Sequence, residues 1–88
     1  MPNIFNSPQC KPILLRHAKS KLDAFGKLGN IKTYEDGYIA YLIDSVDEVI
    51  YIITSTRNPY EPKKYKSITA AVKAMESIGI TTSKVTVL

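Results

Sequence analysis

Basic and aromatic side chains lie close together in one short stretch of this 88-residue sequence. The candidate residues are Arg57, Lys63, Lys64, Tyr65 and Lys66, with Tyr60 between them. Lysine and arginine side chains bind phosphate groups, while tyrosine rings stack on bases or hydrogen-bond to them. We therefore predict that the loop at 57–66 binds nucleic acid, alone or together with the basic N-terminal helix. The alternative is a solvated surface with no binding role. Lysines also protect exposed sheet edges from aggregation.

The distribution of charge says more than the net charge of +4. Residues 1–34 carry six Lys or Arg against one acid, whereas residues 35–48 carry five acids and no base. Residues 57–66 are again basic, with four Lys or Arg against Glu61. Such segregation creates local electric fields. The positive regions suit phosphate, and patches of opposite sign suit contact between two copies of the chain in a homodimer.

The segment from Ile13 to Ser20 carries an Arg-His pair and resembles the signature of the histidine phosphatase family. That resemblance implies His17 as a nucleophile and Arg16 as a phosphate clamp. The chemistry also needs a second histidine and further arginines to hold the phosphoryl group. His17 is the only histidine, and Arg57 is the only other arginine. We therefore interpret the pair as the exposed side of a helix.

Neither a metal site nor a reactive thiol is expected. Asp44, Asp47 and Glu48 lack the ligand number and glycine placement of a calcium loop. Cys10 is the single cysteine, and only His17 is present to serve as its base. We predict no catalytic residue, no cofactor and no small-molecule substrate, so that the protein is not an enzyme.

The same sequence features indicate a compartment. A single cysteine cannot form an intrachain disulfide, which fits a reducing environment. Residues 1–15 lack the continuous apolar core of a secretory signal or a membrane span. We expect a cytoplasmic protein with no membrane partner.

Apolar spacing predicts two helices in one domain. Residues 1–11 form an irregular arm in this interpretation, and residues 12–88 form a single α+β domain. Leu14, Ala18, Leu22 and Phe25 recur at helical spacing, which predicts a helix over 12–27. The residues that follow supply C-terminal stop signals, at Gly26, Gly29 and Asn30. Ser67 is a suitable N-cap, and the apolar face that follows it predicts a helix over 67–78.

Three runs rich in β-branched residues predict strands. They lie at 38–43, 49–55 and 84–88, and a short polar turn joins the first two into an antiparallel hairpin. The expected order is α-β-β-α-β, with an antiparallel sheet of three or four strands packed by two helices. Both faces of the hairpin are apolar and need cover, from two helices or from one helix and a second protomer.

Residues 63–80 combine a basic strand end, an aromatic residue, Lys-Ser and an Ala-rich helix. This pattern resembles short accessory proteins of plasmids and other mobile elements, and it is similar to the integrase arm-binding domains, whose sheet enters a DNA groove. The resemblance implies a small non-enzymatic accessory or regulatory protein. Because the hairpin turn is acidic, only the region from Arg57 to Lys66 is left as the expected contact surface.

Two other functions stay open. A protein-interaction or homodimerisation module would use the apolar hairpin and the patches of opposite charge. An N-terminal helix before an apolar antiparallel sheet also resembles the ribosome-dependent ribonuclease toxins. In that case Arg57, with Tyr60 or Tyr65, would take the catalytic part.

Overall fold

A computed structural model describes residues 9–88, so most of the expected arm at 1–11 lies outside the described residues. The elements follow one another as β1 (Cys10–Leu14), α1 (Leu15–Ser20), the 3-10 helix η2 (Leu22–Phe25), β2 (Gly29–Tyr34), β3 (Gly37–Asp44), β4 (Val49–Thr54), α2 (Ile68–Ser77), the 3-10 helix η3 (Thr82–Lys84) and β5 (Val85–Val87). The last residues of the expected arm, from Cys10 on, belong to β1.

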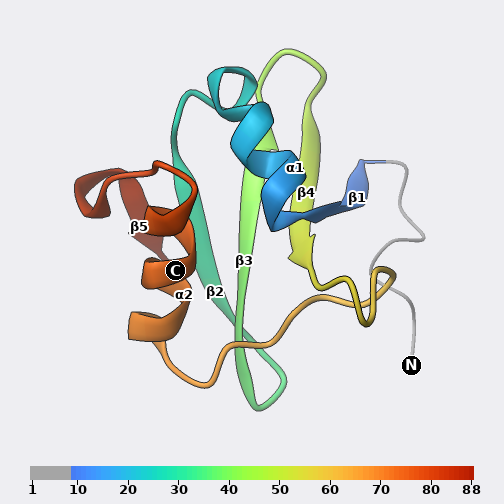
Figure 1. The fold of residues 1–88 in the computed structure, drawn as a ribbon, viewed down its shortest axis with the longest axis vertical. Helices are drawn as coiled ribbons and strands as arrows, with labels where there is room; N and C mark the ends of the chain where they lie inside the picture. Colours follow the sequence, from blue (N-terminus) through green and yellow to red (C-terminus); the bar gives the residue numbers. More distant parts are fainter. Residues whose placement is uncertain (1–8) are drawn as a thin grey trace.

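The strands form one five-stranded mixed sheet in the order β1-β4-β3-β2-β5 (Figure 1). The central strand β3 is antiparallel to both β4 and β2. The outer strands are parallel to their neighbours, β1 to β4 and β5 to β2. The predicted α-β-β-α-β order and the antiparallel sheet of three or four strands are therefore wrong. Two strands, β1 and β2, escaped the sequence pattern.

The predicted helix over 12–27 is wrong in its first turn and is interrupted later. Its first residues form the edge strand β1, where Pro12 is tolerated because an edge needs fewer backbone donors. Ile13 lies opposite Ile53 of β4 and is buried. The helix that follows, α1, has only six residues, and η2 continues after Lys21. An apolar run that ends in Leu14 and Leu15 suits a buried strand as well as a helix, which explains the error.

Strand β2 was not predicted, because its first two residues are typical of the C-terminal end of a helix. Gly29 and Asn30 are the first two residues of β2, not a C-terminal cap. A side chain at Gly29 would place its Cβ atom 2.7 Å from the Sδ atom of Met75. The glycine therefore allows α2 to pack closely on β2.

The hairpin, the second helix and the closing edge strand agree with the sequence prediction. In the β3–β4 hairpin, Asp44 Oδ1 accepts backbone hydrogen bonds from Val46 (3.0 Å) and Asp47 (3.2 Å), which stabilises the turn. Ser67 caps α2, because its Oγ atom accepts a hydrogen bond from the Ala70 amide at 3.1 Å. Strand β5 lies at the edge of the sheet.

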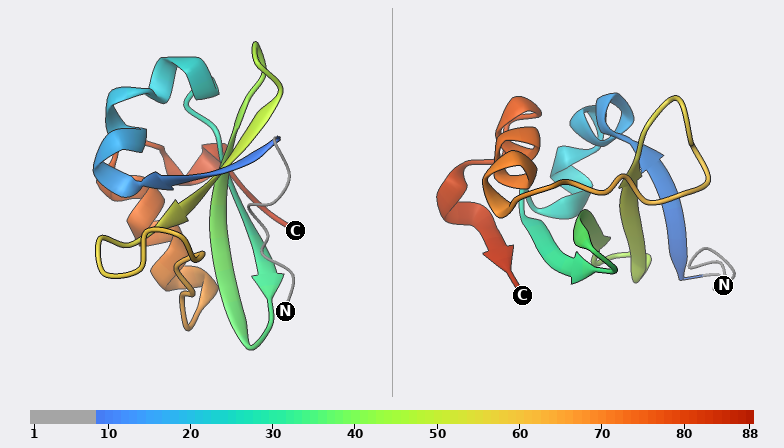
Figure 2. Two further views of the ribbon diagram at one scale, coloured as in Figure 1. Left: turned by 90° about the vertical axis from the view of Figure 1, so that its right-hand side faces the viewer. Right: turned by 90° about the horizontal axis from the view of Figure 1, so that it is seen from below.

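Both helices cover the same face of the sheet (Figure 2). The main core lies between the two helices and the sheet, and its fully buried residues include Ile31, Leu42, Ile53 and Met75. A smaller cluster of Ile39, Tyr41 and Ile52 is buried on the opposite face. Among the described residues, no helix is long and apolar enough to cross a membrane.

Candidate nucleic-acid interface

The basic segment that follows β4 is held against the sheet at two points. Pro62 forms an isolated bridge with Thr54, and the Lys63 amide donates a hydrogen bond of 2.9 Å to the Ile53 carbonyl. Further on, Tyr65 and Tyr38 exchange two backbone hydrogen bonds of 2.7 and 2.9 Å. An extended backbone points successive side chains in opposite directions. The two adjacent lysines between these points therefore have different environments.

Lys64 forms ion pairs with the acidic β2–β3 turn. Its Nζ atom lies 3.1 Å from Glu35 Oε2 and 3.0 Å from Asp36 Oδ1. The hydrogen bond from Lys64 lowers the pKa of Asp36. The bonds to Asp36 and then to Glu35 raise the pKa of Lys64. This lysine is paired with two carboxylates of its own chain, so we do not count it among the phosphate contacts.

Tyr65 belongs to the core. The residue is 8% exposed, and its buried hydroxyl group has no hydrogen-bond partner within residues 9–88. Burial raises the pKa of this hydroxyl. The Nζ atom of Lys63 lies 5.3 Å from the centre of the Tyr65 ring. A base cannot stack on a ring in this position, and the alternative of an Arg57–Tyr65 catalytic pair loses its accessible tyrosine.

Two adjoining hollows open where the parallel strands β1 and β4 end, since Leu14 lies opposite Thr54. The larger hollow has a volume of about 480 Å³, and its polar lining comes from His17, Ser20, Lys21, Tyr51, Thr54 and Tyr60. The smaller hollow, of about 220 Å³, has its polar lining from Arg16, Thr54, Ser55, Thr56, Lys63 and Tyr65. Leu14 and Thr54 line both hollows, which are therefore adjacent.

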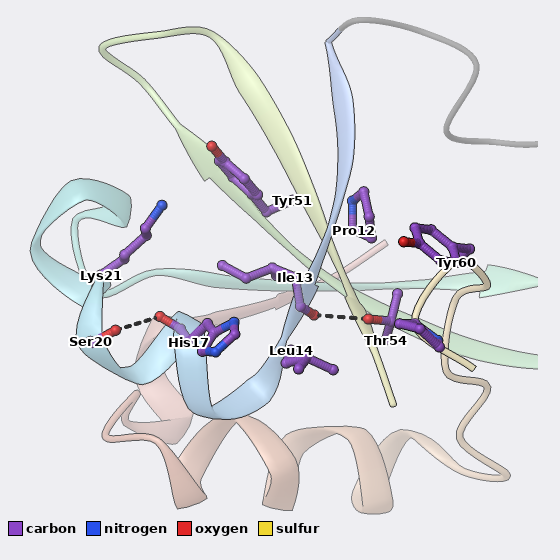
Figure 3. A pocket seen from close by; sticks show the side chains of 10 residues that line it. Pro12, Ile13, Leu14, His17, Ser20, Lys21, Tyr51, Thr54 and Tyr60 are labelled. Carbon is purple, nitrogen blue, oxygen red and sulfur yellow. Dashed lines mark hydrogen bonds between the residues drawn. The ribbon is translucent and has the colours of Figure 1, made fainter. Parts of the chain in front are cut away.

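The larger hollow is bounded by α1 on one side and by the loop after β4 on the other. In Figure 3, His17 and Lys21 lie on one side of Ile13 and Leu14, and Tyr60 lies on the opposite side. Thr54 Oγ1 donates a hydrogen bond of 3.3 Å to the Ile13 carbonyl, which ties the two strand ends together.

The two tyrosines of the larger hollow differ in their surroundings. Tyr51 packs against Phe25, with 5.5 Å between the ring centres, and Lys21 Nζ lies 5.6 Å from the centre of the Tyr51 ring. Tyr60 is 75% exposed. Tyr51 is therefore a fixed wall, and Tyr60 presents an accessible ring.

The surface around both hollows is positive. In residues 9–88, no acidic side chain lines either hollow, whereas Arg16, Lys21 and Lys63 do. Lys64 pairs with both carboxylates of the acidic β2–β3 turn and reduces their net charge from −2 to −1. The acidic β3–β4 turn precedes Val49, which lies five residues, or about 17 Å at roughly 3.3 Å per residue, from Thr54. Tyr51 of the larger hollow lies nearer to this turn, so the smaller hollow, with Arg16 and Lys63, is the part of the site that best suits an anionic ligand.

The structure thus divides the predicted residues and adds others. Lys63 lines a hollow, Lys64 is ion-paired and Tyr65 is buried, while Arg57 and Lys66 are exposed but line neither hollow. Arg16, His17 and Lys21 lie within the predicted helix over 12–27, which we offered as a second contact without naming any of its residues for the site. Sequence reasoning did not assign Tyr51 or Thr54 to the site. Ligands often bind beyond the carboxyl ends of parallel strands. That signal becomes visible only once residues 10–14 are recognised as a strand.

The described residues contain no group of three His, Cys, Asp or Glu side chains placed to hold a metal ion. No family model, curated protein or solved structure matches the chain.

Proposed function

We propose that this protein is a small non-enzymatic accessory or regulatory protein that binds nucleic acid at the ends of β1 and β4. One observation carries the proposal: Arg16 of α1 and Lys63 of the loop after β4 line the same hollow. The first helix and the basic loop therefore contribute to one positive surface. The resemblance of residues 63–80 to accessory proteins of mobile elements supports the same class of function.

Phosphate contacts explain why this arrangement suits a nucleic acid. Each cation that neutralises a phosphate releases a condensed counterion, which makes the affinity depend on salt. Arg16 and Lys63 are exposed, and no carboxylate of the described chain lies beside them in the hollow. Arg57 and Lys66 lie on the same loop segment and add to the long-range attraction.

The test is the salt dependence of binding to labelled oligonucleotides, measured by fluorescence anisotropy. We expect log K to fall linearly with log salt concentration. Arg16→Ala or Lys63→Ala should each reduce the slope by about 0.7–0.9, the contribution of one phosphate contact. Lys73→Ala is the matched control, because Lys73 is an exposed residue of α2 that lines neither hollow. It removes the same charge and should leave the slope nearly unchanged.

No measurable binding at low salt would contradict the proposal. Equal changes in slope for the Lys73 variant and the Lys63 variant would show that only the total charge matters.

A protein-interaction role is the second candidate, favoured by two exposed apolar residues. Ile43 (43% exposed) and Ile50 (36% exposed) are direct partners across β3 and β4 on the face opposite the helices. Val46, in the adjoining turn, is 85% exposed. This patch is small beside the roughly 800 Å² that each partner buries in a stable interface. A dimer detected by light scattering at micromolar concentration, and lost in Ile43→Ser, would support this second candidate.

A further inference from the structure

We infer that the bound nucleic acid is single-stranded, with one unstacked base in the larger hollow and a neighbouring phosphate at the smaller hollow. The inference depends on the proposed function and adds the class of its ligand. Single-stranded DNA and RNA share this chemistry, so both are included.

The concave shape of the site favours an unpaired base. In a duplex the bases are paired and stacked inside, and only their edges are accessible in the grooves. Recognition of single strands instead places splayed-out bases on aromatic side chains. The larger hollow lies between α1 and the loop after β4, and a volume of about 480 Å³ leaves ample room for a planar base. A duplex cannot fill it.

Tyr60 is the ring on which we expect the base to stack. Three quarters of its surface is exposed at the border of the hollow. Among the described residues, its ring contacts no other aromatic ring and no cation, in contrast to that of Tyr51. Pro59 precedes it, and a proline ring reduces the number of backbone conformations. Pro59 thus reduces the backbone entropy that the loop can lose on binding.

The backbone hydrogen bonds of the loop support this position. The Asn58 amide donates to Ser55 Oγ at 3.2 Å, and the Glu61 amide donates to the Asn58 carbonyl at 3.3 Å. The first bond turns the chain before Tyr60, and the second closes a turn that contains Tyr60.

The smaller hollow suits the phosphate. Arg16 and Lys63 supply positive charge there, and Ser55 supplies a hydroxyl group. Because Ser55 Oγ already accepts the Asn58 amide, its own proton stays available for a phosphate oxygen. The two hollows share Leu14 and Thr54, so a base and the phosphate next to it can occupy them together.

The experiment compares three labelled ligands of one sequence at one salt concentration: single-stranded DNA, single-stranded RNA and duplex DNA. We expect both single strands to bind more tightly than the duplex. Tyr60→Ala should weaken single-strand binding by about 5-fold to 150-fold, which corresponds to the loss of one base–aromatic stacking contact. Tyr60→Phe keeps the ring and should bind nearly as well as the unmodified protein. Tyr60→Leu keeps an apolar side chain without the ring and should resemble Tyr60→Ala.

The outcomes separate the two proposals. Duplex binding that equals or exceeds single-strand binding, with no effect of Tyr60→Ala, would overturn the single-strand inference and leave the proposed function in place. Failure of all three ligands to bind would overturn both. A preference for one of the two single strands would identify the sugar that the site accepts. Because Tyr60 is exposed, circular dichroism should show unchanged folding in all three variants.

Discussion

The contact between Gly37 and the basic segment provides a strict test of the structure. Gly37 begins β3 and is buried. A Cβ atom at this position would lie 2.9 Å from the Tyr65 carbonyl oxygen. That oxygen also accepts the hydrogen bond from the Tyr38 amide at 2.9 Å, so the backbone cannot move away without losing the bond. We therefore expect Gly37→Ala to destabilise the fold.

The size of the effect follows from two routes of relaxation. If the two backbone hydrogen bonds between Tyr38 and Tyr65 stay, the added methyl group overpacks the site, which costs about 1–3 kcal/mol. If the segment moves away, the two backbone hydrogen bonds between Tyr38 and Tyr65 are lost, at about 0.5–1.5 kcal/mol each. Alanine also restricts the unfolded chain, which offsets about 0.4–1 kcal/mol. The expected net loss is about 1–2 kcal/mol, and each kcal/mol lowers Tm by about 4–8 °C in a domain of this size.

Urea and thermal unfolding measure the loss, and hydrogen exchange of the Tyr38 and Tyr65 amides locates it. Gly29→Ala is the matched control. Its Cβ atom would approach Met75 Sδ even more closely, at 2.7 Å, but a thioether side chain can rotate away. We expect a smaller loss for Gly29→Ala. Equal stability of Gly37→Ala and the unmodified protein, or a larger loss in Gly29→Ala, would refute the reasoning.

Two further predictions concern side chains of the same region. Tyr65→Phe removes a buried hydroxyl group that has no partner in the part of the chain that the structure describes, so we expect thermal unfolding to show a gain of about 1 kcal/mol. A loss of stability would indicate an unrecognised hydrogen bond. The lowered pKa of Asp36 should be visible in an NMR titration of its carboxyl carbon, and Lys64→Gln should return it toward the ordinary value. Because the pKa of Asp36 falls and that of Lys64 rises on folding, the ion pair stabilises the turn between the two titrations. The contribution is lost as pH falls through the Asp36 pKa and as pH rises through the Lys64 pKa.

The sequence was a reliable guide where one local signal had one interpretation. Ser67 and the apolar face behind it specify α2, and the capping bond to the Ala70 amide is present. The polar turn between two β-branched runs specifies the β3–β4 hairpin. The apolar character of both hairpin faces was also informative. The two helices cover one face, and Ile39 and Ile52 are buried on the other.

The sequence was ambiguous where non-local pairing decides the structure. Residues 10–14 form a strand because they pair in parallel with the free edge of β4. Strand β4 lies far away in the sequence, so the residues next to 10–14 carry no signal of this pairing. Gly29 indicates a helix end locally, but its small size is used for packing against Met75. These two misreadings removed both outer neighbours of the hairpin and with them the parallel pairs of the sheet. They also hid the shared end of β1 and β4, where the candidate site lies.

The roles of the basic residues could not be predicted from composition, because Lys63, Lys64 and Lys66 are chemically equivalent in the sequence. The structure separates them through the direction in which the backbone points each side chain. Lys63 and Lys64 are neighbours in one extended segment, yet Lys63 lines the smaller hollow and Lys64 binds Glu35 and Asp36. The ion pair also reduces the negative charge at that end of the sheet, because one cation lies beside two carboxylates. The local charge thus depends on two kinds of lysine, one that lines the smaller hollow and one that pairs with the carboxylates of the β2–β3 turn.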